Sequence, residues 1–119
     1  MESFSGTVVR GKQLGRTIGF PTANLDTAAS PAGGVYAVVV TAKGERYRGI
    51  MNVGSHPTAP EGAPTVEVHL LDFEGDLYGD ELRVDIVQTM RDERKFDSLD
   101  ALKEQLRRDE ARARAIVKL

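Results

Sequence analysis

The chain of 119 residues contains no cysteine. Disulfide bonds, a nucleophilic thiol and zinc held by thiolates are therefore excluded, and a reducing compartment is the natural expectation. No apolar run approaches the length that spans a bilayer, and the first residues lack the basic and apolar regions of a signal peptide. We therefore expect a cytoplasmic protein with no membrane anchor.

An excess of positive charge is also missing. The 16 lysine and arginine residues are outnumbered by 18 aspartate and glutamate residues, which gives a net charge of -2. Three tyrosines and four phenylalanines supply the aromatic side chains. An oligonucleotide-binding barrel would need a basic face with interleaved aromatic residues, so we expect no nucleic-acid partner.

Runs of β-branched or alternating residues predict strands. They cover residues 7–10, 35–42, 47–53, 65–71 and 82–89, and stretches rich in glycine, proline and aspartate separate them. Residues 42–45 are turn-like and predict a hairpin. GFPTANL, residues 19–25, predicts a short edge strand or strand entry, because Pro21 has no N–H for a central ladder. About six closely spaced strands without intervening helices favour a closed or nearly closed antiparallel barrel.

The last quarter of the chain predicts one amphipathic helix. Asp97 or Ser98 is a suitable N-cap, and apolar residues recur at helical spacing: Leu99, Leu102, Leu106, Ala113 and Ile116. The charges between residues 103 and 114 are interpreted as a solvated face with i to i+4 pairs. No linker divides the chain, so residues 1–119 are expected to form a single domain.

A glycine-rich segment near the start invites comparison with a phosphate-binding loop. Residues 6–13, GTVVRGKQ, place Gln13 where that motif needs a hydroxyl, and no helix follows, so the motif is rejected. The segment that continues through Gly11 and Arg16 still offers backbone N–H groups and a cation to an anion. An ordinary flexible connector is the alternative interpretation.

Thr22 and Asn24 are separated by a single alanine. In an extended segment, residues two apart share a face, so a hydroxyl and a carboxamide oxygen lie side by side. Mg²⁺ takes oxygen ligands and often completes its shell with water and substrate phosphates. The alternative is that both side chains satisfy backbone groups at a strand entry.

Glu67 and His69 alternate with valines in residues 65–71. One face of this strand is core-like, and the other carries a carboxylate and an imidazole. A carboxylate facing a cleft is suited to accept a proton from a hydroxyl nucleophile, with His69 steering it. A solvated strand face is the alternative.

Together these segments resemble riboflavin kinase, in the same order and spacing. The resemblance runs from Gly6 to about Asp109, and its motifs are RTIGFPTAN at 16–24, GVY at 34–36, NVG at 52–54 with PT at 57–58, VEVH at 66–69, DLYG at 76–79 and RDERKF at 91–96.

The resemblance implies a mainly β fold: a six-stranded antiparallel Greek-key barrel with a C-terminal α-helix. It implies Mg²⁺-dependent transfer of the γ-phosphoryl group from ATP to the 5′-hydroxyl of riboflavin, which gives FMN and ADP. On the nucleotide side, the resemblance assigns Mg²⁺–nucleotide binding to Thr22 and Asn24, the phosphate-side loop to Gly11 and Arg16, and the lining of the nucleotide to Leu70 and Tyr78. It assigns the catalytic base to Glu67. It assigns the flap that closes over the flavin to Arg91 and the loop to Phe96. Arg16 stands where many relatives carry lysine.

A non-catalytic flavin- or nucleotide-binding barrel is the main alternative. Glu67, Thr22 and Asn24 argue against it, since binding a flavin needs no base. Riboflavin, FMN, ATP and ADP are the expected partners of a monomer. A stand-alone kinase and the kinase module of an enzyme that also adenylylates FMN fit the sequence equally.

Overall fold

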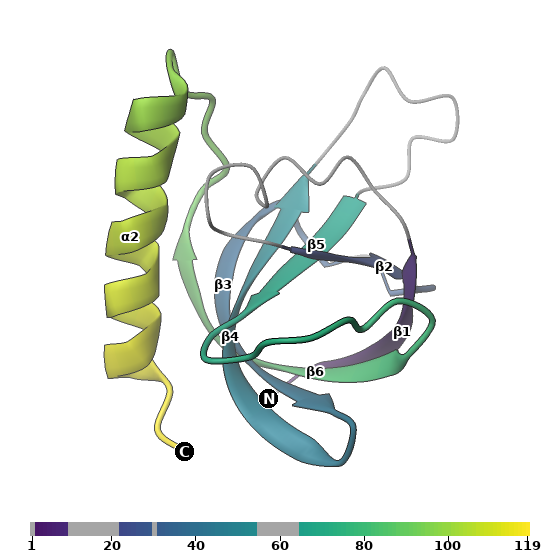
Figure 1. Ribbon diagram of the computed structural model, residues 1–119. Coiled ribbons are helices and arrows are strands. Elements are labelled where there is room, and N and C mark those ends of the chain that lie inside the picture. The colour runs from purple at the N-terminus through teal and green to yellow at the C-terminus, as the bar shows by residue number, and fades with distance from the viewer. Residues whose placement is uncertain (1, 10–21, 30, 55–64) are drawn as a thin grey trace, which may run out of the picture.

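The computed structural model describes residues 2–9, 22–29, 31–54 and 65–119 (Figure 1). Within these residues, six strands close into a barrel in the order β1-β2-β5-β4-β3-β6, and all neighbours are antiparallel. The elements are β1 (Ser3–Val9), β2 (Ala23–Asp26), β3 (Gly34–Ala42), β4 (Glu45–Gly54), β5 (Thr65–Leu70), β6 (Glu81–Arg91) and α2 (Leu99–Ile116). Strand β6 returns to lie beside β3 of the β3–β4–β5 meander, which is Greek-key order. The predicted fold class is confirmed.

The hairpin between β3 and β4 is confirmed at the predicted turn. Ala42 pairs with Glu45, and the two residues between them, Lys43 and Gly44, have φ angles of 50° and 81°. Positive φ at both central positions is the geometry of a type I′ turn, whose twist matches that of the flanking strands. Strand β1 begins earlier than predicted, at Ser3, because its alternation continues through Phe4 and Gly6.

Of the two predictions for GFPTANL, the edge strand is wrong, whereas the strand entry fits the start of β2 at Ala23. Strand β2 pairs with β1 on one side and with β5 on the other, so it is an interior member of the closed barrel. The argument from proline did not apply, because the strand begins at Ala23 and every residue within it has an N–H. Residues 19–21 lie outside the described part of the chain.

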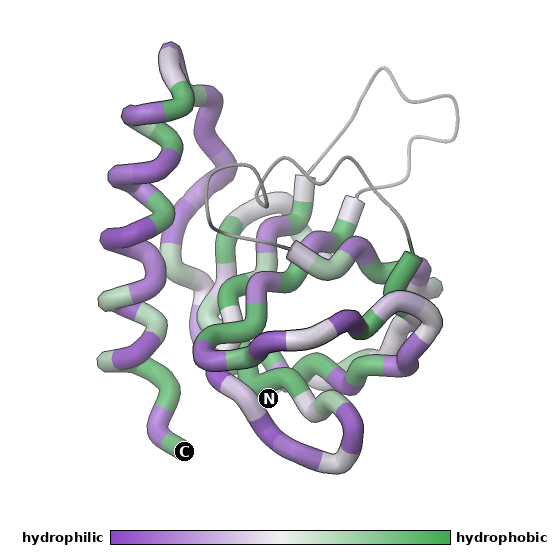
Figure 2. Tube along the Cα trace, in the orientation of Figure 1, coloured by the Kyte–Doolittle hydropathy of each residue, from purple (hydrophilic) through white to green (hydrophobic). Residues whose placement is uncertain are grey.

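The barrel interior is filled by inward-facing aliphatic side chains and a methionine. Val38, Met51, Val68, Leu82 and Val84 are fully buried there. Burying each such side chain contributes about 1.5–3 kcal/mol relative to leaving it exposed. Hydrophobic and hydrophilic residues alternate along parts of the strands (Figure 2), and the hydrophobic members of such an alternation face the interior. Where helix α2 does not cover it, the outer face is therefore free to carry polar residues.

Helix α2 stands outside the barrel against β3, β4 and β6 (Figure 1). The Ser98 hydroxyl caps it by accepting a hydrogen bond from the Ala101 N–H at 3.1 Å, as predicted. Ala113, near its end, and Val117, just beyond it, join a second apolar cluster on the outer surface of the barrel. Among the described helices, none combines the length and apolarity that crossing a membrane requires.

The predicted apolar and charged faces of α2 need correction. Leu99 is 51% exposed, whereas Asp109 is 3% exposed and buried against the barrel. The exposed i to i+4 pair of Glu104 and Arg108, at 2.7 Å, fits the predicted solvated face. Asp109 does not fit it, because its partner is contributed by a strand. Helical spacing reveals which residues share a face but not what that face meets.

Candidate active site

Glu67, the predicted base, lies in the middle of three strands that carry polar side chains at matching positions. Val66 and Val68 point into the barrel, so Glu67 is on the outer face. Asn24 of β2 lies directly opposite Glu67 on one side, and Asn52 of β4 on the other. Cβ atoms of directly opposed residues are about 4.5–5.5 Å apart, and their side chains share a face. Asn24, Glu67 and Asn52 therefore form a row, called the polar row below.

Sequence reasoning missed Asn52 as a site residue. NVG, residues 52–54, was noted only as part of a family resemblance, because the position of Asn52 beside Glu67 depends on how β4 and β5 are registered. Asn24 and Glu67 are half-buried and Asn52 is exposed, so the end of the row at Asn52 faces solvent. It combines a proton acceptor with two carboxamides that can donate or accept hydrogen bonds.

The predicted metal ligands, Thr22 and Asn24, lie at the end of the polar row that is opposite to Asn52. Thr22 is half-buried and directly precedes β2, and Asn24 is the second residue of that strand. Within the described residues, no group of three or more His, Cys, Asp or Glu side chains is placed to hold a metal ion. A hydroxyl and a carboxamide oxygen near a carboxylate fit a hard cation such as Mg²⁺ that takes its remaining ligands from water and phosphates.

His69 does not complete the polar row. It lies on the same outer face of β5 as Glu67, but its ring is turned toward helix α2, with Nε2 3.9 Å from a carboxylate oxygen of Glu110. Its side chain is 16% exposed. This position favours the interpretation of His69 as a residue between barrel and helix rather than as a partner of the base.

A groove begins at Asn52 and runs between the barrel and the start of α2. Its volume is about 440 Å³, within the range of small-molecule sites. Three leucines of the predicted apolar face of α2 lie along it. The residues lining it are Val35, Asn52, Arg91, Glu93, Arg94, Phe96, Ser98, Leu99, Leu102 and Leu106. Asn52 therefore belongs both to the polar row and to the groove.

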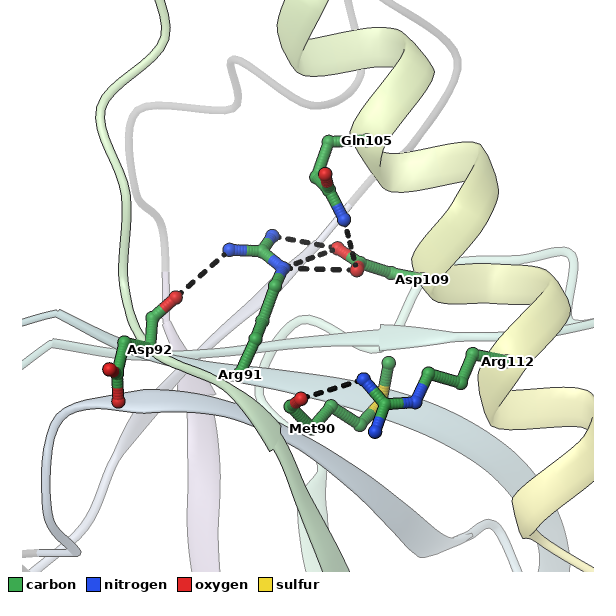
Figure 3. A network of polar contacts seen from close by, with 6 residues as sticks. All are labelled: Met90, Arg91, Asp92, Gln105, Asp109 and Arg112. Carbon is green, nitrogen blue, oxygen red and sulfur yellow. Dashed lines mark hydrogen bonds and ion pairs between the residues drawn. The ribbon is translucent and has the colours of Figure 1, made fainter.

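Arg91, at the end of β6, is held from the helix side of this groove (Figure 3). Its Nε and Nη2 groups donate to Asp109 at 3.0 Å and 2.7 Å, and its Nη1 donates to the backbone oxygen of Asp92. Gln105 donates a further bond to Asp109 at 3.0 Å. The side chains of Arg91 and Asp109 are only 18% and 3% exposed. Such a two-point contact fixes the plane of the guanidinium as well as its position.

An irregularity in β6 turns Arg91 toward the helix. Along β3, Val35 pairs with Arg91 and Tyr36 pairs with Thr89, so the pairing skips Met90. A residue inserted in this way lets two consecutive side chains lie on one face, and Met90 joins the apolar cluster beneath α2. The backbone oxygen of Met90 accepts a bond from Arg112 Nη1 at 2.7 Å. The helix thus supplies a hydrogen-bond donor to the backbone at the irregular pairing.

Phe96 contributes an aromatic ring to the same wall of the groove. The guanidinium carbon of Arg91 lies 5.9 Å from the ring centroid, and that of Arg94 lies 5.1 Å from it. Both distances are within the range of cation–π attraction. Arg91 and Phe96 of the predicted flap are therefore brought together, and Asn52 links their groove to Glu67.

Leu70 and Tyr78 are not brought together with the polar row. Leu70 points into the barrel, on the face of β5 opposite to Glu67, and is 7% exposed. Tyr78 is 54% exposed in the segment before β6, and its backbone N–H donates to Asp76. The predicted phosphate-side residues Gly11 and Arg16 lie outside the described part of the chain.

A second groove, of about 610 Å³, contains none of the predicted site residues. Its charged lining comes from Arg46, Arg83, Asp85 and Lys118. The Ser3 hydroxyl donates to Asp85 and, with Arg83 and Arg46, lowers the pKa of that carboxyl. This carboxyl is held ionised by its neighbours and is not suited to accept protons near neutral pH. Volume alone therefore does not identify the active site.

Comparison with known proteins identifies the family. The family model for riboflavin kinase, Flavokinase, matches residues 2–117. This chain belongs to the riboflavin kinase family. The bifunctional riboflavin kinase/FMN adenylyltransferase of Escherichia coli K12 is 50% identical over 115 residues, which are 94% of this chain and 37% of that protein. The RNA-binding riboflavin kinase RibR of Bacillus subtilis is 43% identical over 111 residues, covering 92% and 48%.

Solved structures of two similar proteins share the fold, and one of them is a riboflavin kinase. The riboflavin kinase of Trypanosoma brucei is similar over 95% of this chain and 77% of its own, with a TM-score of 0.67 and 26% identity. A Streptococcus pneumoniae protein described as a macrolide-efflux protein is similar over 94% of this chain and 38% of its own, with a TM-score of 0.88 and 40% identity. The present riboflavin kinase domain thus spans little more than a third of the bifunctional enzymes that it matches.

Proposed function

We propose that this chain catalyses transfer of the γ-phosphoryl group of ATP to the 5′-hydroxyl of riboflavin, giving FMN and ADP. The observation that carries the proposal is the position of Asn52, which joins the polar row around Glu67 to a groove of about 440 Å³. A flavin ring in the groove would extend its ribityl chain past Asn52 toward Glu67. Family membership and the fold support the same activity.

Glu67 is the proposed general base. Its carboxylate accepts the proton of the riboflavin hydroxyl while the hydroxyl oxygen forms a bond to the γ-phosphorus and the bond to the β–γ bridging oxygen breaks. The bridging oxygen leaves with ADP. Such a transfer needs little covalent help from the protein and depends on positioning and charge neutralisation. The carboxamides of Asn24 and Asn52 on either side of Glu67 supply part of that positioning.

Thr22 and Asn24 are the residues that would hold Mg²⁺, through a hydroxyl and a carboxamide oxygen. The ion would neutralise the charge of the nucleotide phosphates. Gly11 and Arg16 are proposed to contact these phosphates. The exposed Tyr78 is proposed to line the nucleotide, whereas the side chain of Leu70 is buried in the barrel and is not. Because Asn24 lies directly opposite Glu67, a metal ion held there would bring the nucleotide phosphates close to the proposed base.

The groove is proposed as the flavin site. Leu99, Leu102 and Leu106 offer an apolar side to a ring system. Arg91 and Phe96, with the guanidinium carbon 5.9 Å from the ring centroid, offer a polarisable side. This use would explain why three leucines of α2 remain partly exposed. It also explains an aromatic residue in a loop that is otherwise charged.

The domain is further proposed to act as a cytoplasmic monomer without nucleic acid. A net charge of -2 gives it no general attraction for a polyanion, although one relative is named RNA-binding. A non-catalytic flavin- or nucleotide-binding barrel is less well supported, because it gives no purpose to Glu67 at the centre of the polar row.

The test is to incubate the purified chain with riboflavin, ATP and MgCl₂ and to separate the flavins by chromatography. FMN should accumulate with one ADP formed per FMN, and omission of MgCl₂ should suppress it. Binding of riboflavin without any FMN formation would instead establish the non-catalytic alternative.

A further inference from the structure

Asp109 is the buried charged residue of the described chain that the proposed reaction does not use. It lies on α2, outside the barrel, and its carboxylate receives bonds from Arg91 and Gln105. Burying an ion pair costs desolvation energy, and apolar residues of similar size often serve stability equally well. The buried ion pair of Arg91 and Asp109, which lies beside the groove, is therefore better explained by a role in positioning a residue of the groove.

The contacts of Arg91 show what is held. The Asp109 carboxylate accepts hydrogen bonds from Nε and Nη2 on one edge of the guanidinium, and the backbone oxygen of Asp92 accepts one from Nη1 on another edge (Figure 3). The plane of the group is thus fixed from two directions, with the Phe96 ring 5.9 Å away. Arg91 lines the groove in this orientation. Without Asp109, an unpaired charge that is 18% exposed would turn toward water, and the groove is the open space beside it.

We propose that Asp109 is a positioning residue for flavin binding, which holds the Arg91 guanidinium against Phe96 as a wall of the groove. Gln105 orients the carboxylate, and Arg112 anchors the same stretch of β6 through the Met90 oxygen. Helix α2 then belongs to the binding site, although Asp109 itself does not line the groove. The inference rests on the proposed function, because it takes the groove as the flavin site.

The first experiment compares Asp109→Asn with Glu104→Gln. Both exchanges convert a carboxylate on α2 that is 2.7 Å from an arginine nitrogen into a carboxamide, but Glu104 is 65% exposed and lies away from the groove lining. Asp109→Asn should raise the KM for riboflavin about tenfold, as expected for a lost hydrogen bond to a charged group. The kcat and the KM for ATP should change less than about twofold. Glu104→Gln should alter none of these values.

A double variant separates positioning from stability. Arg91→Met with Asp109→Leu replaces the pair by apolar side chains, which should preserve a folded protein, as a thermal melt will show. If the pair only stabilises the fold, this variant recovers the riboflavin KM of the wild type, and the proposal is overturned. If the held guanidinium is the wall, the KM stays raised in a protein that melts normally.

Gln105→Ala is a third, milder variant, which leaves both members of the ion pair and removes one bond to Asp109. It should raise the riboflavin KM severalfold, and an unchanged KM would count against the proposal even if Asp109→Asn does not fold. Riboflavin affinity from quenching of its fluorescence, measured with ADP and Mg²⁺, provides a readout without turnover. Wild-type protein that binds riboflavin but makes no FMN would refute the proposed function alone, and the binding assay would still test Asp109.

Discussion

Asn52 of β4 lies directly opposite Glu67 of β5, on the outer face of the barrel. Its carboxamide therefore stands between the proposed base and the groove. Asn52→Ala should lower kcat/KM for riboflavin about two- to tenfold, because one uncharged hydrogen bond is lost. Gln88→Ala, an exposed amide on β6 outside the groove lining, is the control and should leave steady-state kinetics unchanged. Wild-type kcat/KM in the Asn52 variant would remove this residue from the site.

Glu67→Gln tests the proton acceptor. The exchange preserves size and hydrogen bonding but removes basicity, so kcat should fall roughly 10²–10⁴-fold while riboflavin and nucleotide still bind. Glu81→Gln, at an exposed position of β6, is the matched control. Turnover near the wild-type value in the Glu67 variant would show that another group takes the proton.

Thr22→Ala and Asn24→Ala test the proposed metal ligands. Both should raise the KM for Mg·ATP at least roughly tenfold, since even indirect partners of a bound metal matter on this scale. Riboflavin affinity without nucleotide should change little. Titration with Mg²⁺ at fixed ATP measures the effect directly. Variants that lose thermal stability, with no selective defect in Mg·ATP, would support the alternative that these side chains only satisfy backbone groups.

The segment after Arg91 should respond to ligands. Arg91 is held by the helix, whereas residues 92–95 are exposed and form no regular structure. We predict that amide hydrogen exchange over residues 92–96 slows when riboflavin and Mg·ADP are both bound, because the segment then closes over the flavin. Strand residues 45–54 provide the internal reference. Equal exchange with and without ligands would mean that the segment is a fixed wall.

Asp72 offers a test of pH dependence. Its carboxylate accepts two bonds from Arg114, at 2.7 Å and 2.9 Å, and this contact lowers its pKa. The contribution to stability is therefore complete above the unfolded-state pKa of about 3.9 and is lost as the pH falls through the lower folded-state pKa. Asp72→Asn should lower the Tm slightly at pH 7, and the difference should vanish in acid. High salt should also reduce it, since the pair is exposed. A difference independent of pH would contradict this origin.

The sequence predicted the barrel and the helix because their signals are local. Alternation in residues 65–70 placed Glu67 on the face opposite to the core, and a serine before an amphipathic run located the start of α2. Asn52 was not predicted as a site residue, because alternation along a strand shows on which face a residue lies but not which residue of the neighbouring strand it pairs with. The register of β4 with β5 is set by closure of the whole barrel.

The role of Asp109 was hidden for a different reason. Within α2 it looks like one more charge on a solvated face, since its neighbours in sequence are charged as well. Its partner, Arg91, lies on a strand and faces the helix only because the pairing of β6 skips Met90. The hydrophobic pattern of the sequence does not indicate an irregular strand pairing. Neither the buried ion pair of Arg91 and Asp109 nor the groove wall could therefore be derived from that pattern.

The pairing of β6 with β3 skips Val87 as well as Met90. Seven residues of β3 are thus spanned by nine of β6, and the surplus lies on the side facing the helix. The number of residues in this part of β6 is therefore constrained by its contacts with the helix. Exchanging side chains there changes packing by degrees, whereas losing one residue would rotate Arg91 away from Asp109 and detach helix and groove together. Family members are therefore expected to vary in residue type along this strand far more readily than in residue number.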